Sequence, residues 1–133
     1  LPKDIFGLCD FMTPNETETE ALTGLPVRNE EEAETAAKVL NKLGVKTPII
    51  TMGEQGAFLY GHGLIPAFKV GEVVETTGAG DAFNGGFAVA LSEGKSAFEA
   101  VKFGCATASI SVTRAGTAPS MPARDEVEDL LLV

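Results

Sequence analysis

One stretch of this sequence decides its fold class and its chemistry: Glu75-Thr76-Thr77-Gly78-Ala79-Gly80-Asp81-Ala82-Phe83-Asn84-Gly85-Gly86. A glycine-rich turn there runs directly into a mostly apolar helix, which we expect from Ala79 to Ser92. Backbone N–H groups converge at such a junction and carry the positive end of the helix dipole. Glycine also lets a phosphate approach the backbone closely. The stretch therefore predicts an anion site at the start of a helix.

Asp81 stands in the expected first turn of that helix. A carboxylate there would repel a bound phosphate, and accepting the proton of an attacking hydroxyl is one reason for its presence. An ordinary aspartate that stabilises a helix start, beside glycines that only make a turn, explains the composition equally well. Two known phosphate loops do not fit. No lysine follows Gly80 as a P-loop requires, and Phe83 occupies the place of the third glycine of a dinucleotide fingerprint.

Strands and helices alternate along the rest of the chain, which predicts an α/β fold with a largely parallel sheet. Helices are expected at 16–23, 29–43, 79–92, 96–113 and 124–131, and strands at 9–13, 48–52 and 57–60, with a hairpin or meander at 64–70. Asn29 is expected to cap the second helix, and Gly24 to end the first. We find no linker that would separate two domains.

The composition excludes several classes of partner. The 133 residues include 10 Lys+Arg and 19 Asp+Glu, a net charge of −9, which argues against nucleic acid and anionic membranes. Cys9 and Cys105 lie too far apart for a zinc ribbon, and they suit a reducing cytoplasm. The chain opens with Leu1 rather than Met, so we expect a fragment of a longer protein.

The Glu75–Asp81 stretch resembles the D-T-x-G-A-G-D signature of the PfkB family of carbohydrate kinases. Three further segments agree with that family in the right order. Thr13–Glu18 resembles its T-P-N-x-x-E element, Thr51–Gly56 resembles its T-x-G-x-x-G loop, and Val112–Ser120 resembles the tail of its ribokinase branch. The resemblance implies a three-layer, Rossmann-like ribokinase fold with a mostly parallel sheet and flanking helices. Residues 1–133 would be the carboxyl-terminal part of the large domain, without the amino-terminal sugar-binding and lid part.

The resemblance also assigns roles to individual residues. Asp81 would be the general base that takes the proton of the primary hydroxyl of a sugar, and the N–H groups of Gly78, Ala79 and Gly80 would form an anion hole for the transferred phosphate. Contacts to ATP would come from Thr51, Gly53, Glu54, Gln55, Gly56, Gly80 and Cys105. A tight turn between two strands would need the same glycines, and a buried core cysteine is an equally good interpretation of Cys105.

Two cation sites follow from the same resemblance. Asn15 and Glu18 would help to place Mg²⁺ and the phosphates, although Asn-x-x-Glu is also the pattern of a helix capping box. A monovalent cation, K⁺, would be held by Glu75, Thr77, Ser111, Arg114, Gly116 and Ser120. The family signature normally opens with aspartate, so Glu75 predicts a K⁺ site with altered geometry or a weakened one.

The function implied is ATP-dependent phosphorylation of the primary hydroxyl of a sugar, with D-ribose as the first candidate. A fructokinase or another PfkB sugar kinase is the alternative, and a catalytically silent nucleotide-binding fragment is a second one. The family implies a homodimer for the whole enzyme. The isolated chain is expected to be inactive, because the sugar-binding elements would precede Leu1.

Overall fold

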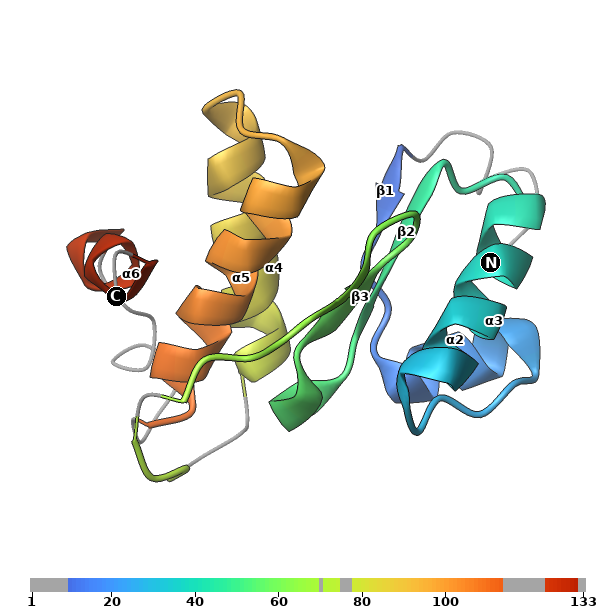
Figure 1. Cartoon of the computed structure of the whole chain (residues 1–133), viewed down its shortest axis with the longest axis horizontal. Coiled ribbons are helices and arrows are strands. Elements are labelled where there is room, and N and C mark those ends of the chain that lie inside the picture. The colour runs from blue at the N-terminus through green and yellow to red at the C-terminus, as the bar shows by residue number, and fades with distance from the viewer. Residues whose placement is uncertain (1–9, 70, 75–77, 114–123, 132–133) are drawn as a thin grey trace. The chain divides into compact units, whose positions relative to one another are not determined.

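The chain divides into two units, Leu1–Ile65 and Pro66–Val133. The computed structural model describes residues 10–69, 71–74, 78–113 and 124–131 (Figure 1). Strands β1 to β4 and helices α2 and α3 belong to the first unit, and helices α4, α5 and α6 belong to the second. The predicted α/β class is confirmed, because helices and a sheet alternate along the described chain.

The sheet of the first unit has the strand order β1-β2-β3-β4. Its strands are β1 Phe11–Met12, β2 Thr47–Thr51, β3 Ala57–Leu59 and β4 Gly63–Ile65. Strands β1 and β2 are parallel, whereas the β2–β3 and β3–β4 pairs are antiparallel. The described sheet is therefore mixed rather than mostly parallel as expected. The connections after β2 and β3 are too short for a crossover helix, so both strands return as a meander.

Two helices cover one face of this sheet, α2 Glu16–Thr23 and α3 Glu30–Lys42 (Figure 1). Small residues on α3 let it lie close to the strands, and Ala33, Ala36, Ala37 and Leu40 are fully buried. They pack in one cluster with Ile50, Met52 and Phe58 of the strand region. Asn29 caps α3 and Gly24 ends α2 in the left-handed conformation, φ 73°, as the sequence predicted.

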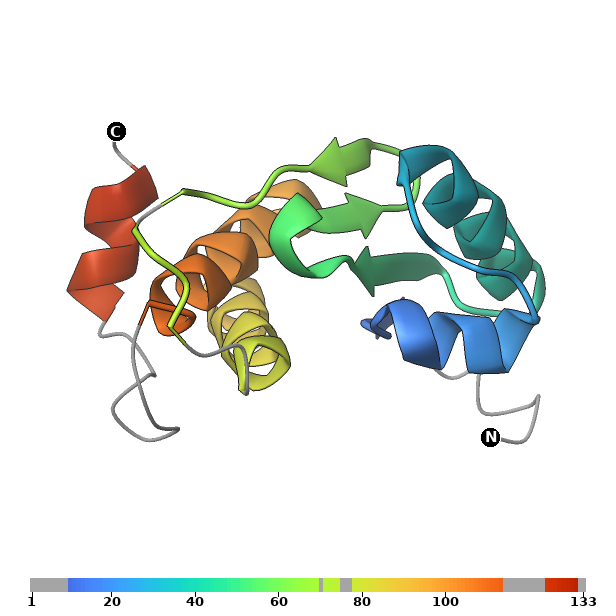
Figure 2. The ribbon, with the colours of Figure 1, turned by 90° about the horizontal axis from the view of Figure 1, so that it is seen from below.

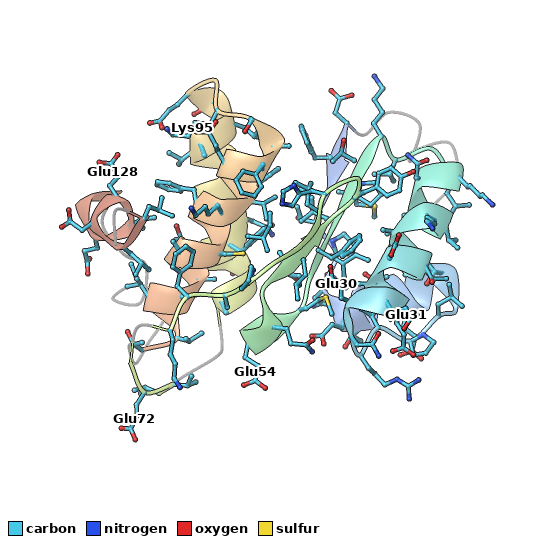
Figure 3. All side chains as sticks on the ribbon, in the orientation of Figure 1. Glu30, Glu31, Glu54, Glu72, Lys95 and Glu128 are labelled. Carbon is cyan, nitrogen blue, oxygen red and sulfur yellow. The ribbon has the colours of Figure 1, made fainter. Side chains whose placement is uncertain are left out.

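Strand β4 lies at one end of the described sheet and is joined to α3 by a side chain. The N–H of Leu64 donates a 3.0 Å hydrogen bond to the carboxylate of Glu30, in the first turn of α3 (Figure 3). The Tyr60 hydroxyl donates to Asn41 near the other end of the same helix, at 3.2 Å. These two bonds hold the meander against α3.

The second unit is built on two helices that lie side by side, α4 Ala79–Ser92 and α5 Ala97–Ser111 (Figure 2). Glycines at the contact allow the close approach: Gly104 of α5 meets Phe83, and Gly86 of α4 meets Thr107. The last helix, α6 Arg124–Leu131, packs on α5. No helix among the described residues combines the length and the apolar character that crossing a membrane requires.

Candidate functional site

Helix α4 begins differently from the other helices whose first residues are described. Asn15, Asn29 and Ser96 each accept a backbone N–H with their side chains at the starts of α2, α3 and α5. Helix α4 instead begins after Gly78, which has φ 89° and offers no side-chain cap. Because the first N–H groups of a helix have no partner within it, those of Ala79, Gly80 and Asp81 remain available to a ligand.

Asp81 lies in the first turn of α4 and is exposed. Phe83 and Phe87 anchor the buried face of the same helix, with ring centroids 6.1 Å apart. The carboxylate therefore stands on a fixed helix start beside the uncapped N–H groups. A general base next to an anion hole would need a carboxylate at a helix start of this kind, and the role of Asp81 stays a prediction.

The chain that leads into α4 runs along the end of α5. The N–H of Val74 donates to the carbonyl oxygen of Val112 at 2.7 Å, and the N–H of Phe68 donates to the Ser109 hydroxyl at 3.0 Å. Ser111, at the end of α5, is only 1% exposed. Of the residues predicted to bind a monovalent cation, Ser111 is described, and the others lie outside the described residues: Glu75, Thr77, Arg114, Gly116 and Ser120. That site remains a prediction.

The predicted nucleotide loop follows β2 in the first unit. Thr51 ends β2, and the short 3-10 helix Gly53–Gln55 follows it, exposed along its whole length. Gly53 and Gly56 have φ of 55° and 113°, values that side chains other than glycine rarely adopt. Figure 3 shows the Glu54 side chain pointing away from the sheet. The glycines are explained by the turn itself, and nucleotide contact remains a prediction.

Asn15 and Glu18 form the capping box of α2. The Glu18 N–H donates to Asn15 Oδ1 at 2.7 Å, and the Asn15 N–H donates to Glu18 Oε1 at 2.9 Å. Parallel bridging brings Asn15 beside Thr51, whose N–H donates to the Pro14 carbonyl oxygen at 2.9 Å. Residues of two separate motifs, Asn15 and Thr51, therefore meet at one end of β2. Both members of the box are exposed, and a carboxylate with an amide oxygen is a donor set that suits Mg²⁺.

Replacing Asn15 by alanine removes one half of this capping box. We expect the free energy of unfolding to fall by about 0.5–2 kcal/mol, because the Glu18 N–H loses its acceptor. Urea denaturation of the chain measures the change. The matched control is Thr17→Ala, which changes an exposed side chain in the first turn of α2. This variant should lower the free energy of unfolding by less. Equal costs for the two variants would show that the cap contributes nothing.

Cys105 lies within α5 and is 4% exposed. Its burial agrees with the core interpretation of this cysteine. Its predicted place beside an adenine ring is not tested by this burial.

The sequence motifs missed a pair of residues beside the predicted nucleotide loop. Arg28 and Glu32 form a two-bond ion pair, with Nε to Oε1 at 3.0 Å and Nη2 to Oε2 at 2.7 Å. The side chain of Gln55 reaches the Arg28 carbonyl oxygen at 3.2 Å. The i,i+4 spacing of Arg28 and Glu32 was visible in the sequence, but their proximity to Gln55 was not.

Known proteins resemble this chain along almost all of its length. Residues 2–124 match the model of the pfkB family carbohydrate kinases. The ribokinase of Haemophilus influenzae is 46% identical over 98% of this chain, and the alignment spans 44% of that protein. This chain therefore spans less than half the length of this curated relative.

Solved structures agree in fold as well as in sequence. The crystal structure of a ribokinase from Thermotoga maritima is 47% identical, with a TM-score of 0.89 over 100% of this chain and 46% of that one. The structure of Arabidopsis thaliana ribokinase complexed with ribose and ATP is 39% identical, with a TM-score of 0.91 over 99% of this chain and 44% of that one. The described units thus have the fold of the corresponding part of ribokinases, and the chain belongs to the pfkB family of carbohydrate kinases.

Proposed function

We propose that this chain carries the ATP-binding and catalytic part of a kinase that phosphorylates the primary hydroxyl of D-ribose. The observation that carries the proposal is the start of α4, where exposed Asp81 follows Gly78 and the uncapped first turn. A protein that only binds a nucleotide has no need of a carboxylate at that position, because it repels phosphate. Ribose is the sugar proposed because the relatives described above are ribokinases.

Asp81 accepts the proton of the sugar hydroxyl while the hydroxyl oxygen attacks the γ-phosphorus of ATP. The bond from that phosphorus to the β–γ bridging oxygen breaks, and ADP leaves. The N–H groups of Ala79 and Gly80, with that of Gly78, stabilise the charge on the transferred phosphoryl group. The catalytic contribution of the chain is therefore a proton acceptor placed beside fixed N–H donors.

The first unit supplies contacts to the nucleotide in this proposal. Thr51 and the turn Gly53–Gly56 would contact ATP, and Asn15 and Glu18 would help to hold Mg²⁺. Mg²⁺ supplies neutralisation of the phosphate charge when it is bound. Potassium near the end of α5, a cytoplasmic location and a homodimeric whole enzyme belong to the same proposal by family resemblance, and no partner among nucleic acids or membranes is proposed.

The test joins this chain to the amino-terminal part of the Haemophilus influenzae ribokinase, in place of the segment that it matches. We call this protein the complemented enzyme. It is expected to produce ADP only when ribose and Mg·ATP are both present. Potassium is included or omitted in parallel assays. The isolated chain is expected to bind Mg·ATP in calorimetry without measurable turnover.

Two results would contradict the proposal. A complemented enzyme that folds and binds ribose but makes no ADP would support a silent nucleotide-binding fragment. Turnover by the isolated chain would contradict the proposal that the sugar is bound by the amino-terminal part of the enzyme.

A further inference from the structure

The turn that follows β2 is held by its own backbone, by the paired strands β2 and β3 on either side of it, and by a side-chain hydrogen bond to another element. Within the turn, the Gln55 N–H donates to the Met52 carbonyl oxygen at 3.0 Å and the Gly56 N–H donates to that of Gly53 at 3.2 Å. The Met52 N–H also donates to the Gly56 carbonyl oxygen at 2.8 Å, and Met52 is 1% exposed in the core cluster, so the two ends of the turn are fixed. Gly53, Glu54 and Gln55 are all exposed, so little burial restrains them.

Gln55 makes a side-chain hydrogen bond that joins the exposed part of the turn to another element. Its amide nitrogen Nε2 donates to the Arg28 carbonyl oxygen at 3.2 Å, across 27 residues of sequence. Arg28 lies in the connector just before Asn29, the N-cap of α3. The bond therefore links the turn after β2 to the residue just before the start of α3.

Arg28 is held in turn by Glu32. The Arg28 N–H donates to Glu32 Oε1 at 2.8 Å, and its guanidinium donates to both carboxylate oxygens at 3.0 and 2.7 Å. The hydrogen bonds from the Arg28 side chain and backbone lower the pKa of Glu32 below its ordinary value, so the carboxylate is charged at neutral pH. The backbone N–H of Glu32 also donates to the side-chain Oδ1 of Asn29, the N-cap of α3, at 2.9 Å. The acceptor that Gln55 uses is thus part of a fixed helix start.

We propose that Gln55 is a positioning residue for the nucleotide turn, which it holds through the Arg28 carbonyl oxygen, and that Glu32 supports it by fixing Arg28. Gln55 then acts on ATP affinity through the conformation of Gly53–Gly56 and not as a direct ligand of the nucleotide. This inference rests on the proposed function, because it assumes that ATP lies against the turn. It adds two residues, Arg28 and Glu32, that the family motifs do not include.

The test compares Gln55→Leu and Glu32→Gln with the matched control Glu34→Gln. Leucine has a similar length without a donor, and Gln at position 32 loses the charge that pairs with Arg28. The control makes the same change two residues along α3, where Glu34 pairs with Lys38 on the surface at 3.5 Å. Amide hydrogen exchange at Gln55 and Gly56 is measured on the chain without nucleotide, and KM and kcat on the complemented enzyme.

Gln55→Leu is expected to speed exchange at both amides and to raise KM for ATP about three- to tenfold, the loss of one hydrogen bond, with kcat unchanged. Glu32→Gln should move both readouts in the same direction by less, and Glu34→Gln should move neither. The melting temperature of each variant is measured to separate local loosening of the turn from loss of the fold.

Each contrary outcome points to a different error. A wild-type complemented enzyme that does not bind ATP overturns the proposed function, and this inference with it. If the wild type binds ATP and Gln55→Leu changes neither exchange nor KM, the positioning role alone is wrong. A higher KM with unchanged exchange would make Gln55 a direct ligand of the nucleotide, which also overturns the positioning role.

Discussion

Replacing Asp81 by asparagine is expected to lower kcat of the complemented enzyme by about 100- to 10,000-fold, the usual contribution of a general base. The amide keeps the size of the side chain but cannot accept the proton of the sugar hydroxyl. The affinity for ATP should stay the same or rise slightly, because a negative charge beside the phosphates is removed. Such a fall in kcat without a rise in KM identifies an interaction made in the transition state.

The matched control for this variant is Asp129→Asn, the same chemical change on an exposed residue of α6. Steady-state kinetics and calorimetry with Mg·ATP are measured for both proteins. The loss of a first-turn carboxylate costs only about 0.3–1 kcal/mol of helix stabilisation, so the Asp81 variant should remain folded. If it retains near-normal kcat, Asp81 only stabilises the start of α4 and the proposed mechanism is wrong.

Replacing Gly104 by alanine is expected to reduce the free energy of unfolding by about 1–3 kcal/mol, the usual cost of overpacking. A Cβ at this position would lie 2.9 Å from two ring carbons and from the backbone carbonyl oxygen of Phe83. The carbonyl cannot rotate away, so α4 and α5 must separate. Gly86→Ala should cost a similar amount, because its Cβ would overlap the Thr107 side chain.

Urea denaturation of the chain measures both losses, with Gly80→Ala as the control for stability alone. Gly80 also lies in α4, but an added Cβ there meets no atom within 4 Å. Because alanine favours the helix over glycine, this variant should be as stable as the wild type or slightly more stable. If Gly104→Ala is equally stable, the two helices do not need glycine at their contact.

Local features of the structure were predictable from the sequence. Helices α4 and α6 have the predicted bounds, Ala79–Ser92 and Arg124–Leu131, and Asn29 is the N-cap of α3 as expected. These features depend on neighbours within one or two turns, which a sequence displays directly. The direction of β3 depends on which strands pair, and the alternation of strands and helices suggested a parallel arrangement for it that the structure does not have. A hairpin or meander is expected from the sequence at 64–70, and β4 does run antiparallel there, paired with β3.

The candidate site was predictable as a set of motifs but not as a geometry. The spacing of Asn15 and Glu18 is enough to predict the capping box. The observed hydrogen bonds are compatible with both interpretations of the pair, as a helix cap and as ligands of Mg²⁺. The contact between Asn15 and Thr51 arises from a parallel bridge between two residues that are 36 positions apart in the sequence. No local sequence pattern predicts such a bridge. The Gln55–Arg28 bond is of the same kind, since neither residue type signals the other.

The bond from Leu64 to Glu30 bears on how separate molecules of this protein meet. An outer strand with open N–H groups is a template on which a strand of a second molecule can add, and this is one route to aggregation. The carboxylate of Glu30 accepts the hydrogen bond of one such N–H, that of Leu64. Its negative charge also repels a second copy of this acidic chain. The residue that holds the meander against α3 thus also blocks one N–H with which a strand of a second molecule could pair.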